Sequence, residues 1–172
     1  DNVNLPQVIH YLAMTILGPN HDRPSPNYYI YRDTNGTGEW SMFPWDLDRW
    51  FGMDQFLTNP GINTIFYGDR EHERASSGNP DQFNRLNEAI FDTFRTREMF
   101  RRHVRTVVDQ WMNTSYFEDN IDAFEEMITL DAALDNQKWR IGSLSNGVRA
   151  LKNQIATHRR LLAEDPEIPP TI

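Results

Sequence analysis

The stretch Asn27–Asp46, NYYIYRDTNGTGEWSMFPWD, decides how the first part of the chain folds. Both of its ends are rich in aromatic and β-branched residues, which favour β-strands. Between them, the Asn-Gly dipeptide at 35–36 is the strongest short-range signal of a β-hairpin turn. We therefore expect paired strands over 28–32 and 39–43. Pro44 has no backbone N–H to give to a strand ladder, so the second strand should stop there.

Helices should flank this hairpin. Over Leu5–Leu17 the apolar residues share one face, Asn4 suits the N-cap, and Pro6 lies in the first turn, where it is tolerated. Three later segments carry apolar residues at helical spacing: Phe100, Val104, Val107 and Trp111; Phe117, Ile121, Phe124 and Ile128; Leu144, Val148, Leu151, Ile155 and Leu162. Core packing is the usual role of such stripes. The sequence thus predicts an α+β fold, mostly helical, in which a β-hairpin packs on a helical bundle.

The chain has 172 residues, enough for one domain with a sizeable core. Within a single domain over 1–172, we expect a segment of polar candidate residues over 1–52, a long loop over 53–82, a helical part over 83–165 and a departing tail over 166–172. The loop is rich in Gly, Asn, Pro, Asp and Ser and has no sustained period. Because the chain begins with Asp rather than Met, we expect it to be a piece of a longer protein.

The overall charge argues against a nucleic-acid partner. The net charge is -8, and Lys138 and Lys152 are the only lysines. The arginines between Arg95 and Arg105 form one basic run, which we interpret as a solvated helix face. No cysteine is present, which excludes disulfides and thiolate metal sites. No apolar stretch approaches the roughly 20 residues that a membrane span needs.

Three polar residues stand at the ends of the predicted hairpin and just before it. Antiparallel strands lie about 4.8 Å apart, so a strand that starts at Asn27 and one that exits at Asp46 bring these residues together. Asp22 precedes them by a few residues. Carboxylate and amide oxygens, completed by water and phosphate, are the ligands that Mg²⁺ prefers. The same residue types also punctuate ordinary turns, which is the competing interpretation.

The order of these residues matches a catalytic pattern. Protein kinases carry an aspartate, an asparagine five residues later, and then an aspartate ahead of a Phe-Gly pair, here Phe51-Gly52. The first group receives or orients the attacking hydroxyl, and the other two hold Mg²⁺ against the nucleotide phosphates. The pattern therefore points to phosphoryl transfer.

Two other sites compete for the same region. A Ca²⁺ loop over Asp46, Asp48 and Asp54 fits poorly, because Phe51 stands where an EF-hand needs glycine. The tryptophans Trp40, Trp45 and Trp50 form a possible sugar-stacking platform, although aromatic residues beside a buried strand more often pack in the core.

The chain resembles a known family. The matching motifs are Asn20-His21-Asp22, Asn27 to Arg32, Trp40, Phe43-Pro44-Trp45-Asp46-Leu47-Asp48 and Phe51-Gly52. Together they resemble the signature of the CotH kinase family, named for a spore-coat protein. The segments 101–113, 121–131 and the last helix through Arg159-Arg160 also resemble the C-terminal half of that family, so the resemblance covers nearly the whole chain.

The resemblance implies an atypical protein kinase that uses ATP and Mg²⁺ to phosphorylate hydroxyl side chains of a protein substrate. It makes Asp22 the catalytic aspartate, and it makes Asn27 and Asp46 the residues that bind the metal and the nucleotide. Asp48 would support the metal. It also implies a bacterial protein of the spore coat, of the cell surface or secreted.

One departure from a complete kinase matters. Kinases also need an upstream phosphate-covering loop and a strand lysine paired to a helix glutamate. Lys138 and Lys152 lie too late in the chain, in helical contexts, to serve. The chain therefore resembles the C-terminal lobe without its N-terminal lobe, and we expect it to be inactive by itself. The alternatives are a pseudokinase or structural module in spore-coat or cell-surface assembly, and a carbohydrate-binding module.

Overall fold

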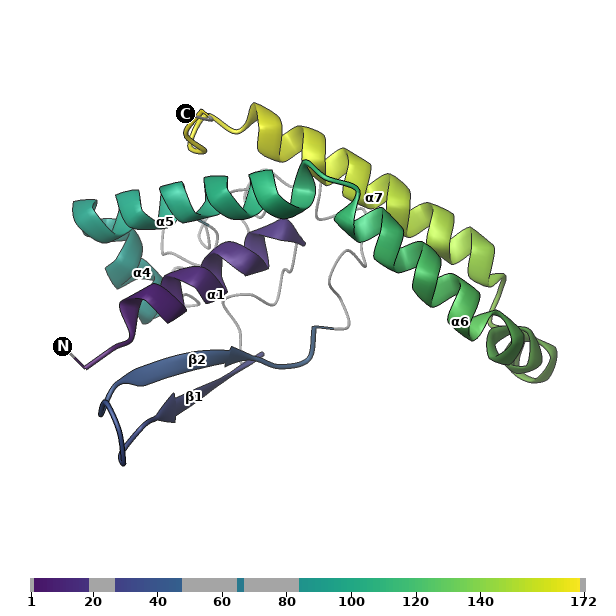
Figure 1. The fold of residues 1–172 in the computed structure, drawn as a ribbon, viewed down its shortest axis with the longest axis horizontal. Coiled ribbons are helices and arrows are strands. Elements are labelled where there is room, and N and C mark those ends of the chain that lie inside the picture. The colour runs from purple at the N-terminus through teal and green to yellow at the C-terminus, as the bar shows by residue number, and fades with distance from the viewer. Residues whose placement is uncertain (1, 19–26, 48–64, 67–83, 171–172) are drawn as a thin grey trace.

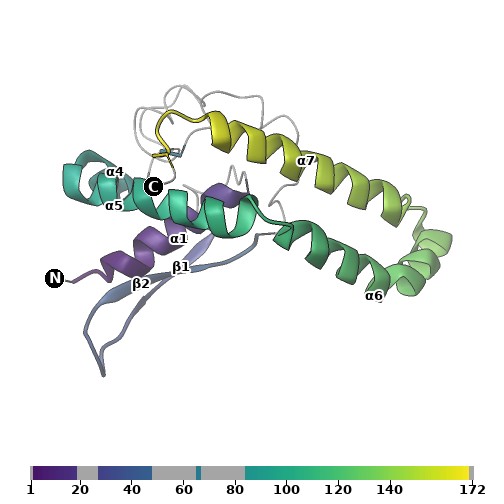
Figure 2. The same ribbon diagram turned by 45° about the horizontal axis from the view of Figure 1, so that its top comes forward.

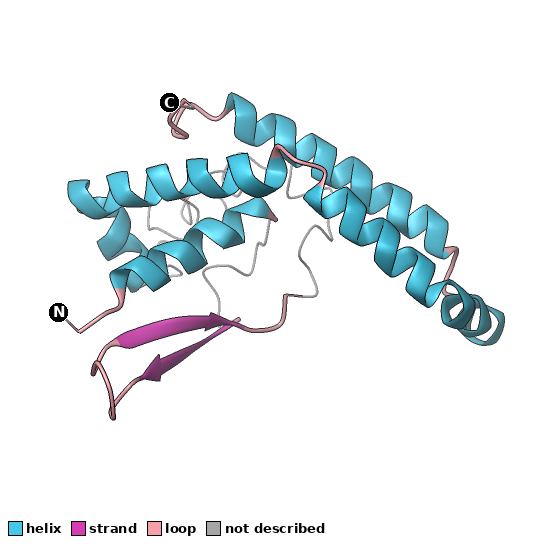
Figure 3. Cartoon of the chain, in the orientation of Figure 1, coloured by secondary structure: helices cyan, strands magenta, loops and turns pink. Residues whose placement is uncertain are grey.

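The computed structural model describes residues 2–18, 27–47, 65–66 and 84–170 (Figure 3). The elements are α1 (Leu5–Leu17), β1 (Tyr28–Arg32), β2 (Trp40–Pro44), α4 (Arg85–Asp92), α5 (Phe94–Val107), the π-helical turn η1 (Val108–Met112), α6 (Tyr116–Trp139) and α7 (Leu144–Glu164). The predicted class, mostly helical α+β with one β-hairpin, is confirmed. Most of the predicted loop over 53–82 lies outside the described residues.

Helix α1 has the bounds that the sequence predicts. The side-chain oxygen of Asn4 accepts a hydrogen bond from the backbone N–H of Gln7 at 3.2 Å, which caps the first turn. Val8, Leu12 and Ile16 on one face are buried against the rest of the core. The helix ends at Gly18, which is extended.

The hairpin pairs β1 with β2 in the antiparallel register Tyr28↔Pro44 to Arg32↔Trp40. In the turn, the backbone N–H of Gly38 donates to the carbonyl of Asp33 at 2.7 Å, and Gly38 takes a φ of 74°, which suits glycine. Met42 is buried on the side that contacts α1. The hairpin therefore lies against one side of α1, and α5 contacts α1 as well (Figure 1).

The core joins α1, the hairpin and the helices that follow. Phe91 and Phe100 pack with ring centroids 4.9 Å apart, and Phe66 lies 5.4 Å from Phe91. These aromatic side chains fill the core beside α1. No helix within the described ranges has both the length and the apolar content to cross a membrane.

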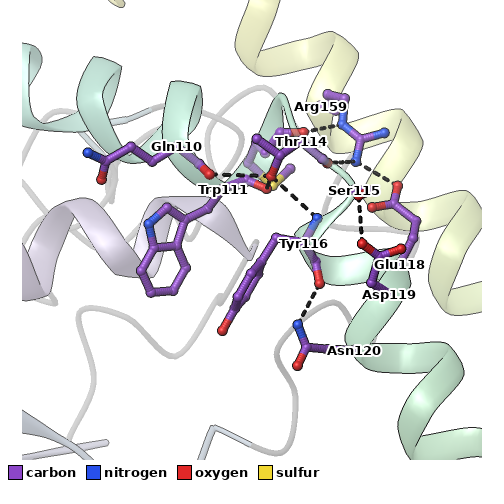
Figure 4. A network of polar contacts seen from close by, with 10 residues as sticks. Gln110, Trp111, Thr114, Ser115, Tyr116, Glu118, Asp119, Asn120 and Arg159 are labelled. Carbon is purple, nitrogen blue, oxygen red and sulfur yellow. Dashed lines mark hydrogen bonds and ion pairs between the residues drawn. The ribbon is translucent and has the colours of Figure 1, made fainter.

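Helices α6 and α7 form an antiparallel arm that projects from this core (Figures 1 and 2). At the root of the arm, Arg159 binds the carbonyls of Met112 and Thr114 and the carboxylate of Glu118 (Figure 4). Of the described residues of α6, none is buried. Phe124 and Ile128 are exposed, so the prediction that they pack in the core is wrong. Among the described elements, α7 packs along α6 beyond the root of the arm and covers one side of it.

The C-terminal segment packs on α5. The Arg101 Nε donates to the carbonyl of Glu167 at 2.6 Å, and the Arg105 Nη1 donates to that of Pro169 at 3.4 Å. Ile168 is buried. The prediction of a departing tail is therefore wrong for residues 166–170, because two arginines of α5 bind their backbone. These contacts also use part of the predicted basic run.

Candidate functional site

The open end of the hairpin brings Asn27 and Asp46 together. The backbone N–H of Trp45 donates to the carbonyl of Asn27 at 3.1 Å, which extends the ladder by one pair beyond Tyr28↔Pro44. The side-chain Nδ2 of Asn27 then donates to the backbone carbonyl of Asp46 at 3.3 Å. Two residues that are 19 positions apart thus share one end of the sheet. Neither of these bonds uses the carboxylate of Asp46 or the Oδ1 of Asn27.

Asp46 has an unusual backbone conformation. Its φ of 53° is left-handed, and Arg140 is the other described non-glycine residue with a positive φ. Asp tolerates this region better than most residues, but it still stores some strain. Since β2 ends at Pro44, the conformation turns the chain away from the strand direction. The carboxylate is exposed, so it is accessible to a cation from solvent.

Asp22 and Asp48 lie outside the described residues, and their roles stay predictions. Among the residues that are described, no group of three or more His, Asp or Glu side chains is placed to hold a metal ion. The described part of the candidate site is therefore the Asn27–Asp46 pair alone.

Exposed aromatic side chains lie beside this pair and along the hairpin. The rings of Tyr29 and Trp45 lie 5.2 Å apart at an angle of 63°, and each ring is more than half exposed. By strand alternation, Tyr31 and Phe43 share the face of Tyr29, which is opposite to the buried Met42. Trp40 is exposed as well, so core packing does not explain Trp40 or Trp45. Trp50 is not among the described residues.

Gln7 of α1 binds the outer edge of β2, opposite the edge that pairs with β1. The backbone N–H of Met42 donates to the Gln7 Oε1 at 2.9 Å, and the Gln7 Nε2 donates to the carbonyl of Met42. The chain before α1 adds two further bonds, because Asn4 N donates to the Trp40 carbonyl and Trp40 N donates to the Asn2 carbonyl, both at 2.8 Å. Nothing in the sequence pattern singles out Gln7 for this role.

Asn84 fastens the start of β1. Its Nδ2 donates to the hydroxyl of Tyr28 at 2.9 Å, while its Oδ1 accepts from the backbone N–H groups of Leu86 and Asn87 and so caps α4. An asparagine just before an amphipathic segment is an N-cap signal, so the cap could be found from the sequence. The bond to Tyr28 could not, because it joins residues 56 positions apart.

Comparison with known proteins gives the relationship of the whole chain. The chain is 26% identical over 137 residues to the inner spore coat protein H of Bacillus subtilis (strain 168). That match covers 80% of this chain and 34% of the relative, so the chain spans about a third of the relative's length. No solved structure matches it significantly. The family model described as CotH kinase protein matches residues 1–162, and the chain therefore belongs to that family.

Proposed function

We propose that this chain is the C-terminal lobe of a Mg-ATP-dependent protein kinase that transfers phosphate to hydroxyl groups of a protein substrate. The observation that carries the proposal is the pairing of Asn27 and Asp46 at the open end of the hairpin. Family membership supports it independently. The same two residue types hold the metal ions in protein kinases.

The described donors suit Mg²⁺. This ion usually takes one or two protein carboxylates and completes its shell with water and substrate phosphates. The Asp46 carboxylate is exposed, and the Asn27 Oδ1 makes no hydrogen bond to another described residue. These two oxygens would hold the ion, with Asp48 in support. Bound there, Mg²⁺ would neutralise charge on the phosphates.

In this proposal, Asp22 orients the hydroxyl of the substrate and accepts its proton. The Asn27 amide also fixes the peptide of Asp46 and so orients the chain that carries the carboxylate. The exposed rings of Tyr29 and Trp45 each offer an aromatic face on which a nucleotide base could stack. A separate N-terminal lobe would cover the phosphates, so the 172-residue chain by itself should bind ATP weakly.

The experiment measures phosphate transfer from ATP by the intact protein that contains this chain. We expect Asp22→Asn and Asp46→Asn each to lower transfer at least about 100-fold while the thermal unfolding midpoint changes little. Asp92→Asn, an exposed aspartate at the end of α4, is the matched control and should keep normal activity. Near-normal transfer by either site variant would rule out its assigned role.

A structural role in assembly is the second candidate, and the similarity to an inner spore coat protein favours it. A spore-coat pseudokinase would keep this fold but would not transfer phosphate. Incubation of the intact protein with labelled ATP, Mg²⁺ and candidate protein substrates separates the two, because phosphate transfer supports the kinase and its absence supports the structural module.

Because Trp40 and Trp45 are exposed, a carbohydrate-binding role is a further candidate. A glycan array tests it directly. Binding that is lost in Trp45→Ala but kept in Trp40→Ala, on the opposite face of the hairpin, would support a sugar platform beside Tyr29, and a blank array would exclude it for the glycans present.

A further inference from the structure

Helix α6 carries two apolar stripes rather than one. Phe117 and Ile121 are half-buried at the root of the arm, and Ile128 continues their stripe along the groove that α6 forms with α7. The second stripe consists of Ala123, Met127, Leu130 and Leu134, at a spacing of four, three and four residues. That spacing places them on one side of a helix, away from the first stripe.

The second stripe is open to solvent. Met127, Leu130 and Leu134 are 73%, 80% and 62% exposed. Single exposed apolar residues are common on protein surfaces, but a contiguous row at helical spacing marks an interaction surface. At 1.5 Å per residue the stripe is about 16 Å long, which matches a partner helix of about three turns.

The charges on either side of the stripe are acidic. Helix α6 contains the carboxylates Glu118, Asp119, Asp122, Glu125, Glu126, Asp131 and Asp135 and a single lysine, Lys138. Glu118 and Asp122 form ion pairs with Arg159 and Lys152 of α7. Within the described part of the chain, Glu126, Asp131 and Asp135 have no such partner and are exposed. By helical spacing, Glu126 lies on one side of the stripe, and Asp131 and Asp135 lie on the other.

We propose that this stripe is a docking surface for a basic amphipathic helix of a partner protein, with apolar residues on one face and Lys or Arg beside them. Such a helix buries Met127, Leu130 and Leu134 and pairs its cations with the flanking carboxylates. A second copy of α6 would place acidic flanks against acidic flanks, which opposes that pairing. An anionic membrane surface is repelled for the same reason.

The position of the stripe suits this role. The arm projects from the core, so a partner can reach α6 without contacting the hairpin (Figures 1 and 2). At the root, the Arg159 Nη2 lies 2.6 Å from the Glu118 Oε1, which holds α6 against α7 (Figure 4). The surface is thus separate from Asn27 and Asp46, and its occupation can be measured without any phosphate transfer.

The test uses two fluorescent peptides of about 18 residues that share an apolar heptad pattern. One has lysines beside the apolar face and the other has glutamates at the same positions. Fluorescence anisotropy with the full chain should show saturable binding of the basic peptide, weakened by salt, and little binding of the acidic one. We expect Leu130→Asp to weaken the binding of the basic peptide at least tenfold. Phe94→Ser, which alters an 81% exposed side chain on α5, should leave its affinity unchanged.

A charge reversal sharpens the result. In the double variant Glu126→Lys/Asp131→Lys, the binding preference should shift from the basic to the acidic peptide. Circular dichroism should show that the helix content of the variant is unchanged. Equal binding of both peptides, binding of neither, or full retention of binding by Leu130→Asp would overturn the proposal. Sedimentation that finds a dimer of the chain, dispersed by Leu130→Asp, would assign the stripe to a second copy instead.

Discussion

The side-chain amide of Asn27 donates a hydrogen bond to the backbone carbonyl of Asp46 at 3.3 Å, so one residue of the candidate metal pair positions the other. Replacement of Asn27 by Ala removes this bond and one oxygen donor together. We expect the Mg²⁺ concentration at half-maximal phosphate transfer to rise about tenfold, as is usual when the partners of a metal ligand are lost. A Mg²⁺ titration of the intact protein measures this. Asn153→Ala on the exposed side of α7 is the control, and an unchanged Mg²⁺ midpoint in Asn27→Ala would contradict the assignment.

The left-handed backbone of Asp46 allows stability and function to be separated. Glycine adopts a φ of 53° without penalty, whereas alanine pays about 1 kcal/mol or more for it. We therefore expect Asp46→Gly to unfold at or above the temperature of the parent and Asp46→Ala to unfold below it. Both should lose phosphate transfer, because both lack the carboxylate. If Gly and Ala gave the same melting temperature, the strained conformation would not be present in solution.

Gln7 joins α1 to the hairpin through both polar groups of the Met42 backbone. In Gln7→Ala these partly buried groups lose their partners, which costs about 1–3 kcal/mol of unfolding free energy. Denaturant unfolding measures the change. Gln137→Ala, on the exposed side of α6, should change the unfolding free energy by less than about 0.5 kcal/mol. Equal effects of the two substitutions would show that Gln7 does not fasten the hairpin.

The parts of the fold that could be predicted from sequence are those with local causes. The cap at Asn4 and the Asn-Gly turn fix α1 and the hairpin within a few residues of each signal. The hairpin register, in turn, brings Asn27 and Asp46 together. Local signals do not place Gln7 against Met42, because that contact spans 35 residues and no sequence pattern encodes it.

The spacing of apolar residues also predicts which face of a helix is apolar, but it does not predict which element covers that face. Phe124 and Ile128 belong to a helical stripe, yet they are exposed because α7 covers only part of α6. For the same reason the second stripe, with Leu130 at its middle, had no sequence signal that separated it from a core stripe. Of the predicted site, the structure describes Asn27 and Asp46, whereas Asp22 and Asp48 lie outside the described residues.

Arg159 and Arg160 are neighbours in sequence with different structural roles. Arg159 binds two backbone carbonyls and Glu118 at the root of the arm, and the Glu118 Oε2 is buried without another described partner. Arg160 makes an exposed pair with Glu164 one turn along α7. We expect Arg159→Ala to cost about 2–3 kcal/mol of unfolding free energy and Arg160→Ala less than about 0.5 kcal/mol. Thermal unfolding of both variants measures the difference, and comparable losses would show that the network in Figure 4 does not hold the arm.

His103 of α5 and His10 of α1 should make stability depend on pH. The His10 Nδ1 and the His103 Nε2 lie 2.8 Å apart, so at most one proton fits between them. Burial, and then the charge of His10, lower the pKa of His103 below its ordinary value of 6.5. The unfolded chain therefore binds a proton at His103 more readily than the folded chain does. As far as His103 contributes, the free energy of unfolding should be highest above about pH 6.5 and should fall as the pH drops below that value.

Thermal unfolding of the parent and of His103→Asn between pH 7.5 and pH 5 measures this effect. At pH 7.5 the difference in melting temperature between the two proteins is the reference, because it reflects the hydrogen bond that the variant lacks. As the pH falls, the melting temperature of the parent should decrease more steeply than that of His103→Asn, because the variant has no imidazole to protonate at this position. Titrating groups away from this contact affect both proteins alike and cancel in the comparison. Parallel pH profiles would show that folding does not lower the pKa of His103.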